Sequence, residues 1–255
     1  MIDEIKNDIK NADMVLAAVG SEFKVLTGED ILRNSTAEQY FAVNEQNAVS
    51  KAAAELYCHS RQDITQLIQP YNELNKLLSD KNYFVITDIT DGLICKSQLN
   101  PIRIVAPCGN MYKLQCQCEE NGIIDIEGYQ ESIISSFEKA LDVKNIFPVC
   151  PKCNCRYSLN VYNKEYYNET GYLKQWNLYN KWLQGTLNKR LVILELGVDF
   201  SYPSLTRWPF EKIVMINKNA KLVRVGMKFN QITKEVSDKM VSVTMNPREF
   251  VEGLL

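Results

Sequence analysis

Histidine is nearly missing from this chain of 255 residues, which contains only one, His59. Histidine is the side chain whose ordinary pKa suits it to act as a general base near neutral pH. His59 lies in the stretch ELYCHSRQD, near the expected end of a helix. We predict a surface side chain there rather than a catalytic one.

Long stretches of one character are missing too. No run of Lys and Arg stands out and the formal net charge is -2, so a basic surface for nucleic acid is not expected. No uninterrupted apolar run approaches the roughly 20 residues that span a bilayer. The first residues, MIDEIKNDIK, are acidic and amphipathic, unlike a secretory signal. We expect a soluble cytoplasmic protein with neither a nucleic-acid nor a membrane partner.

Apolar residues make up 45% of the chain and charged residues 24%. This composition supports a substantial core, in one large domain or in two unequal lobes. Isoleucines recur at helical spacing over residues 2–9, and the apolar stretch at 14–20 is short enough for a buried strand. Residues 35–78 are rich in helix-forming types and indicate two or three helices.

Further buried strands are expected in YFVIT, RLVILEL and AKLVRV. Strands that alternate with helices predict an α/β fold with a doubly wound, mostly parallel sheet. Ligands of such sheets bind outside the carboxyl ends of the strands. The informative loops should therefore follow Val19, Ile86, Leu194 and Val225.

Five of the eight cysteines fall in two clusters, which in a reducing compartment favours a metal over disulfides. Cys150 and Cys153 have the two-residue spacing that lets one tight turn direct both thiolates at a tetrahedral ion. Cys116 and Cys118 are one residue apart and would point in opposite directions in a strand, so a turn must begin there. We expect these four to bind a structural zinc, with Cys155 as a substitute for Cys118. The alternative is a set of buried thiols without metal.

Four stretches in this order resemble the sirtuins, the NAD-dependent protein deacylases and ADP-ribosyltransferases, and most of all the bacterial subgroup associated with macrodomain operons. They are LNKLLSDKNYFVITDITDGL, CGNMYKLQC, PVCPKC and LVILELGVDFSYPSLTRWPF. The resemblance implies a Rossmann lobe over residues 1–28, 80–111 and 162–255. It also implies a smaller lobe, made of a helical module at 29–79 and a zinc module at 112–161. NAD and the substrate would bind in the cleft between the lobes.

The resemblance assigns NAD to loops that depart from the family pattern. The positions that it places against the cofactor are Ala18, Val19, Gly20, Ser21, Glu22, Thr87, Asp88, Asp91, Gly197, Val198 and Gly226. Glu22, Asp88 and Asp199 bring negative charge to these loops. At about 5 Å and an effective dielectric of about 20, each repels a pyrophosphate charge by roughly 3 kcal/mol before relaxation. The sequence therefore leaves NAD binding open.

Cys108 stands where the resemblance places the catalytic histidine. A thiol can act as a nucleophile if its pKa is lowered, but a small residue left after loss of the base is the simpler interpretation. Asp91, Asn110 and Thr87 are the other polar candidates for catalysis.

Two functions follow from the resemblance. One is a pseudoenzyme that binds or regulates a protein without ordinary deacylase activity. The other is an active NAD-dependent transferase, by ADP-ribosylation or deacylation, that uses no histidine and acts on a protein such as a lipoyl-carrier protein. The aromatic stretches SYPSLTRWPF and LNVYNKEYYNETGYL could line a protein-binding cleft, but we expect them in the core.

Overall fold

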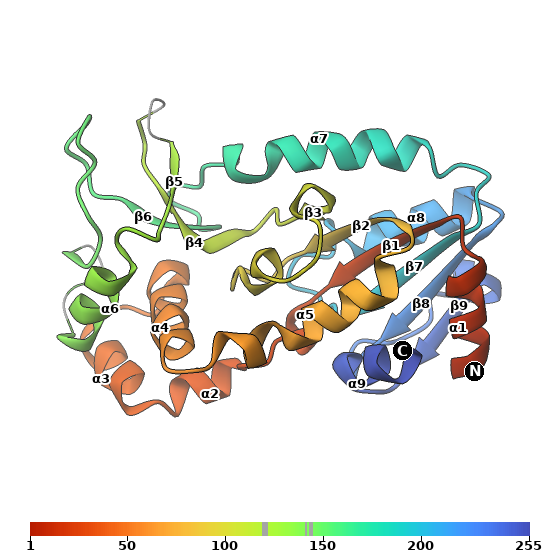
Figure 1. Ribbon diagram of the computed structural model, residues 1–255, viewed down its shortest axis with the longest axis horizontal. Coiled ribbons are helices and arrows are strands. Elements are labelled where there is room, and N and C mark those ends of the chain that lie inside the picture. Colours follow the sequence, from red (N-terminus) through yellow and green to blue (C-terminus); the bar gives the residue numbers. More distant parts are fainter. Residues whose placement is uncertain (119–121, 141, 143–144) are drawn as a thin grey trace.

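A large parallel sheet forms the centre of the protein in this computed structural model, which describes residues 1–118, 122–140, 142 and 145–255 (Figure 1). Its strand order is β3-β2-β1-β7-β8-β9, and all neighbours pair in parallel. The strands are β1 Met14–Val19, β2 Asn82–Thr87, β3 Ile104–Val105, β7 Leu191–Leu196, β8 Ala220–Val225 and β9 Met240–Val243. The doubly wound α/β prediction is confirmed.

Helices cover both faces of this sheet. The helices on one face are α1 Ile2–Asn11, α5 Ile64–Leu78 and α9 Pro247–Leu254, and those on the other are α7 Thr170–Gln184 and α8 Arg207–Ile216. Strand side chains alternate between the two cores: Val15 and Ala17 pack on the first face, and Leu16 on the second. Burial on both faces explains why the strands are almost continuously apolar.

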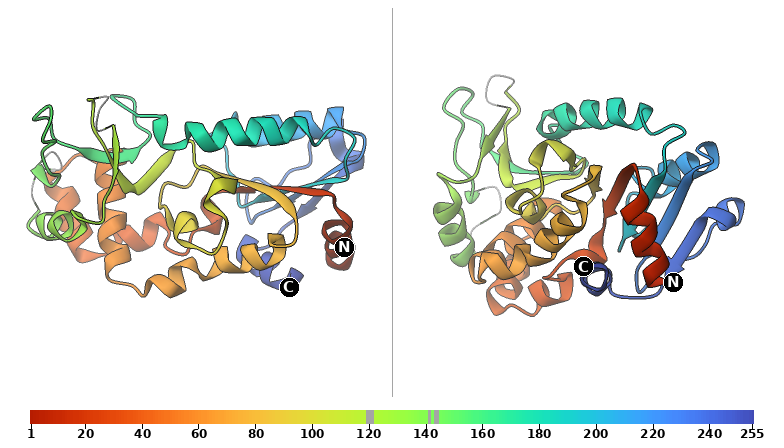
Figure 2. Two further views of the ribbon diagram at one scale, coloured as in Figure 1. Left: turned by 45° about the horizontal axis from the view of Figure 1, so that its top comes forward. Right: turned by 45° about the vertical axis from the view of Figure 1, so that its right-hand side comes forward.

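A smaller lobe lies beside the large sheet (Figure 2). It contains the helices α2 Gly28–Leu32, α3 Ser35–Val43, α4 Ala48–Ser60 and α6 Gln130–Glu138. An antiparallel sheet of order β5-β4-β6 completes it, with β4 Gly109–Gln115, β5 Ile123–Asp125 and β6 Ser158–Val161. Stacked rings join the parts, since Phe137 on α6 lies 4.1 Å from Tyr40 on α3 and 5.2 Å from Tyr57 on α4, measured between centroids.

Short 3-10 turns complete the chain at η1 Ser21–Phe23, η2 Leu93–Lys96, η3 Pro101–Arg103 and η6 Lys234–Lys239. The division into modules at 1–28, 80–111, 162–255, 29–79 and 112–161 stays a prediction, and the last range includes residues outside the described part. Among the described residues, no helix combines the length and apolar character needed to cross a bilayer.

Candidate functional site

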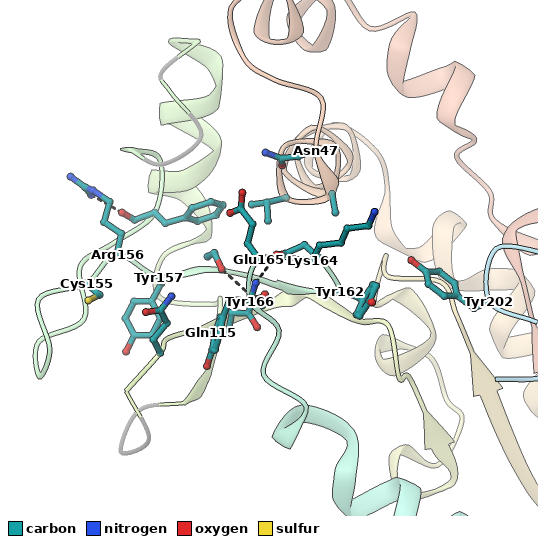
Figure 3. A pocket seen from close by; sticks show the side chains of 16 residues that line it. Asn47, Gln115, Cys155, Arg156, Tyr157, Tyr162, Lys164, Glu165, Tyr166 and Tyr202 are labelled. Atoms are coloured by element: carbon teal, nitrogen blue, oxygen red, sulfur yellow. Dashed lines mark hydrogen bonds between the residues drawn. The ribbon is translucent and has the colours of Figure 1, made fainter. Parts of the chain in front are cut away.

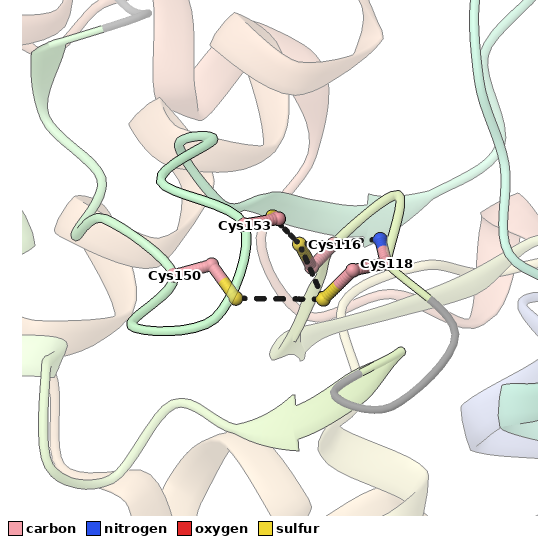
Figure 4. Close-up of side chains that lie close together, drawn as sticks. All are labelled: Cys116, Cys118, Cys150 and Cys153. Carbon is pink, nitrogen blue, oxygen red and sulfur yellow. Dashed lines mark hydrogen bonds between the residues drawn. The ribbon is translucent and has the colours of Figure 1, made fainter.

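Four cysteines meet in the small lobe (Figure 4). The sulfur atoms of Cys116, Cys118, Cys150 and Cys153 all lie within 4.8 Å of one another. Three of the distances are short: 3.4 Å for Cys116–Cys118, 3.3 Å for Cys116–Cys153 and 3.5 Å for Cys118–Cys150. Four thiolates around zinc at about 2.3 Å are separated by roughly 3.8 Å, so the cluster is consistent with a structural zinc.

Local turns bring each pair of cysteines to the cluster. The chain bends after Cys116, as the one-residue spacing requires. In the second pair, Asn154 takes a φ of 56°, in the left-handed region that asparagine tolerates, and its N–H donates to the Cys150 carbonyl at 3.0 Å. Cys155 is exposed and lies outside the group of four, so it is not needed as the substitute for Cys118.

Several predicted cofactor positions lie inside the fold. Ala18 and Val19 belong to β1, and both side chains are buried in the cores. The Thr87 hydroxyl donates to the Val19 carbonyl at 2.8 Å and accepts from the Ile89 N–H at 3.1 Å. These residues hold the ends of β1 and β2 together.

The glycines of the first and third loops pack on each other. The Gly20 N–H donates to the Leu196 carbonyl at 2.9 Å, and a Cβ on Gly20 would lie 2.5 Å from the Gly197 oxygen and from the Val198 Cα. Gly197 has a φ of +67°, and a Cβ there would lie 2.7 Å from the Glu22 Cβ. Both positions need glycine because two backbones approach closely.

The acidic side chains of these loops have partners within the protein. Ser21 donates to Asp199 at 2.8 Å, and Asp199 also accepts from the Ser201 N–H at 2.6 Å. Burial, and then the charge of Asp199, raise the pKa of Asp88 to about 7. Asp88 is therefore largely protonated below neutral pH. The negative charge at this edge of the sheet is then smaller than three ionised carboxylates would give.

Glu22 spans the edge of the sheet from η1 to the loop that follows β8. Its carboxylate accepts from the Met227 N–H at 2.6 Å and from the Lys228 N–H at 3.0 Å. A Cβ on Gly226 would lie 3.1 Å from the same carboxylate. The resemblance placed Glu22 and Gly226 in one site, but it did not indicate that the side chain of Glu22 binds the loop that begins at Gly226.

Cys108 lies immediately before β4 and is only 3% exposed. Burial, and then the charge of Asp88, raise the pKa of its thiol to about 12. Its carbonyl accepts from the Tyr162 N–H at 2.8 Å, and the neighbouring Pro107 carbonyl accepts from the Tyr167 hydroxyl at 2.8 Å. The thiol stays neutral at physiological pH.

The other two predicted catalytic residues bind the backbone beside them. Asp91 is buried and accepts from the Leu93 N–H at 3.0 Å and from the Tyr71 hydroxyl at 3.4 Å. Burial, and then Glu55, raise the pKa of Asp91 to about 7. The Asn110 side-chain oxygen accepts from the Tyr112 N–H at 2.8 Å.

The prediction that His59 lies on the surface is wrong, since it is 4% exposed. The end of α4 packs against β4, where His59 Nδ1 lies 3.2 Å from the Tyr112 hydroxyl. Its Nε2 lies 3.8 Å from the Glu55 carboxylate, which also pairs with Lys24. Burial, and then the charge of Lys24, lower the pKa of His59 to about 3, so its imidazole is neutral and a poor proton acceptor.

A pocket of about 760 Å³ lies between the start of α4, the segment 147–157 and the loop after β6 (Figure 3). Its aromatic lining residues are Phe147, Tyr157, Tyr162, Tyr166 and Tyr202, and its charged ones are Arg156, Lys164 and Glu165. Tyr162 is 45% exposed and its ring lies 5.9 Å from that of Tyr202, between centroids. The expectation that these aromatic stretches are core is therefore wrong for Tyr162, while Tyr166 and Tyr202 are half-buried.

No family model matches the chain. It is 31% identical over 153 residues to a probable bifunctional ADP-ribose hydrolase/ADP-ribosyltransferase of Fusarium oxysporum f. sp. cubense, a match that covers 56% of this chain and 26% of that protein. It is 21% identical over 180 residues to a protein ADP-ribosyltransferase of Staphylococcus aureus, covering 69% of this chain and 57% of that protein. The chain thus spans about a quarter of one curated relative and somewhat over half of the other.

A solved structure of a Sir2 protein with p53 peptide and NAD⁺ superposes with a TM-score of 0.55 at 16% identity, over 99% of this chain and 96% of that one. The parallel six-stranded sheet, the antiparallel small lobe and the four-cysteine cluster are those of the sirtuin fold. This chain has that fold, with distant homology to sirtuin-like ADP-ribosyltransferases and ADP-ribose hydrolases.

The sirtuin fold binds NAD, and the loops predicted to hold it in this chain lie at the carboxyl edge of the large sheet. The space beside Gly20 is filled by the backbone of Gly197 and Val198, and the amides of Met227 and Lys228 are bound to a carboxylate. In this arrangement the loops do not fit a pyrophosphate, which needs open glycine backbone and free N–H donors.

Proposed function

We propose that this chain is a sirtuin-fold protein that binds or regulates a protein partner and lacks ordinary NAD-dependent deacylase activity. The observation that carries the proposal is the buried thiol of Cys108 at the position expected for the catalytic base. A general base must accept a proton at the working pH, and a thiol with a pKa near 12 is already protonated there.

His59 does not replace the missing base. Its low pKa leaves it a weak proton acceptor, and its ring nitrogens face the Tyr112 hydroxyl and the Glu55 carboxylate. The lone histidine therefore supports a structural role.

The tyrosine-lined pocket supports a protein as the partner. Tyrosines bury large apolar area and still offer a hydroxyl, and they are enriched in protein interfaces. The chemistry of the pocket, with Arg156 and Lys164 beside aromatic rings, suits a peptide segment that carries both apolar and acidic groups.

A second candidate is NAD-dependent protein ADP-ribosylation, which the names of the two curated relatives favour. The transfer would use polar residues other than histidine, such as Asp91, Asn110 and Thr87, and a lipoyl-carrier protein is one possible substrate. All three side chains bind neighbouring protein groups in the present arrangement, which weakens this candidate.

The test is nicotinamide release from NAD by the zinc-loaded protein, with acylated peptides and with a lipoylated carrier protein. We expect none above the background of the Cys108→Ser variant, which keeps the size of the side chain. Release by the wild type that disappears in Cys108→Ser or Asp91→Asn would overturn the first candidate in favour of the second.

A further inference from the structure

Glu22 joins three loops at the carboxyl edge of the large sheet. Its own N–H donates to the Gly197 carbonyl at 3.1 Å, in the loop after β7. Its carboxylate accepts from Met227 and Lys228, in the loop after β8, more than 200 residues away along the chain. The backbone and the side chain of one residue thus fasten the loops after β1, β7 and β8 together.

Two consecutive backbone N–H groups directed at one carboxylate form an anion-binding concavity. It lies at the end of a parallel strand, the edge where α/β sheets bind their ligands. In this protein the anion is the chain's own Glu22, so a ligand phosphate at this edge would meet both occupied donors and a like charge.

We propose that Glu22 is the residue that determines the ligand specificity of this edge, because its carboxylate takes the amide donors of Met227 and Lys228 and so excludes a nucleotide diphosphate. This proposal rests on the proposed function in one respect: both hold that no NAD chemistry takes place at this edge of the sheet.

An internal competitor is hard to displace. A group tethered beside its site has an effective concentration on the order of millimolar or more, so a free ligand must exceed this in addition to overcoming the charge. The carboxylate also takes up space beside the loop after β8, since a Cβ on Gly226 would lie only 3.1 Å from it. Removing the side chain frees the two N–H donors, removes the negative charge and opens the space that the side chain takes up.

The experiment is isothermal titration calorimetry of ADP-ribose and NAD on the zinc-loaded, full-length protein and its variants. We expect Glu22→Ala to bind ADP-ribose at least about tenfold more tightly than the wild type, given the charge repulsion removed. Glu22→Gln should lie between the two, because its amide keeps an oxygen for one N–H and loses the charge. Glu29→Ala is the matched control, since Glu29 is exposed and pairs only with the exposed Arg33 in the described structure, and it should bind like the wild type.

A second readout is the hydrogen exchange of the Met227 and Lys228 amides, which should be faster in Glu22→Ala and unchanged in Glu29→Ala. If Glu22→Ala fails to fold, the same comparison is made with Glu22→Gln. Equal affinities of the wild type and the Glu22 variants, or micromolar binding of ADP-ribose by the wild type, would overturn the proposal. Nicotinamide release by the wild type tests the proposed function instead, so the two failures are distinguishable.

Discussion

Arg224 on β8 binds Glu195 on β7 inside the large sheet, where the two residues are register partners on adjacent strands. The guanidinium donates to the carboxylate at 2.5 Å from Nε and at 3.2 Å from Nη2, and both side chains are almost fully buried. Arg224 also donates to Glu211 on α8 and to the Gln231 carbonyl. The pair ties two central strands to the helix that covers them.

Replacing Arg224 by leucine should destabilise the protein by about 3–5 kcal/mol, because Glu195 is left as an uncompensated buried carboxylate. The double variant Glu195→Leu/Arg224→Leu should recover part of that loss, since the buried carboxylate of Glu195 is then removed as well. Urea unfolding of the three proteins measures the difference. A double variant less stable than the single one would contradict this account.

The four-cysteine cluster predicts that metal stabilises the small lobe. Purified protein should contain about one equivalent of zinc, and Cys150→Ser should lose it and melt at a lower temperature, because structural zinc contributes directly to folding. Cys155→Ser is the control and should keep both the metal and the melting temperature. Elemental analysis and thermal melting, with and without a strong chelator, decide the matter; melting unaffected by chelation would argue against zinc.

Asp88 should make stability depend on pH. The pKa of Asp88 in the folded protein, about 7, lies above the ordinary value of 3.8. The stability that Asp88 contributes is therefore present at low pH and is lost as the pH rises from about 4 through 7. Asp88→Asn should therefore gain stability relative to the wild type over this range, by up to about 4 kcal/mol, because each pKa unit corresponds to about 1.4 kcal/mol. Asp80→Asn, at an exposed position, is the control. A wild-type–variant difference that does not change with pH would refute the raised pKa.

His59 gives the opposite sign. Its folded pKa of about 3 lies below the ordinary 6.5, so the stability that it contributes is present above pH 6.5 and is lost as the pH falls toward 3. Because the chain has a single histidine, nitrogen-detected NMR of the imidazole reports on it without ambiguity. The ring should remain neutral at pH 5; a midpoint near 6.5 would show that it is solvated.

The strands were predictable because burial on both faces makes them short, continuously apolar stretches of sequence. The cysteine cluster was predictable because the spacings of Cys116/Cys118 and Cys150/Cys153 require a turn that directs each pair at one metal ion. Glu195 was not predictable as half of a buried pair, since its partner depends on the register of β7 and β8. The same holds for Glu22, whose acceptor role depends on two loops far apart in sequence meeting in space. His59 was misjudged because helix position alone does not tell which end is covered by a neighbouring sheet.

The central strand β1 has consequences for how the chain acquires its structure. Met14 pairs with Asn82 on one side and with Leu191 on the other, so both neighbours of the strand come from remote parts of the sequence. Such long separations slow folding, because large loops must close before the pairing stabilises them. On the ribosome, the edge of β1 that pairs with β7 must stay uncovered until residue 196 has emerged, so that edge is open to wrong pairing during synthesis.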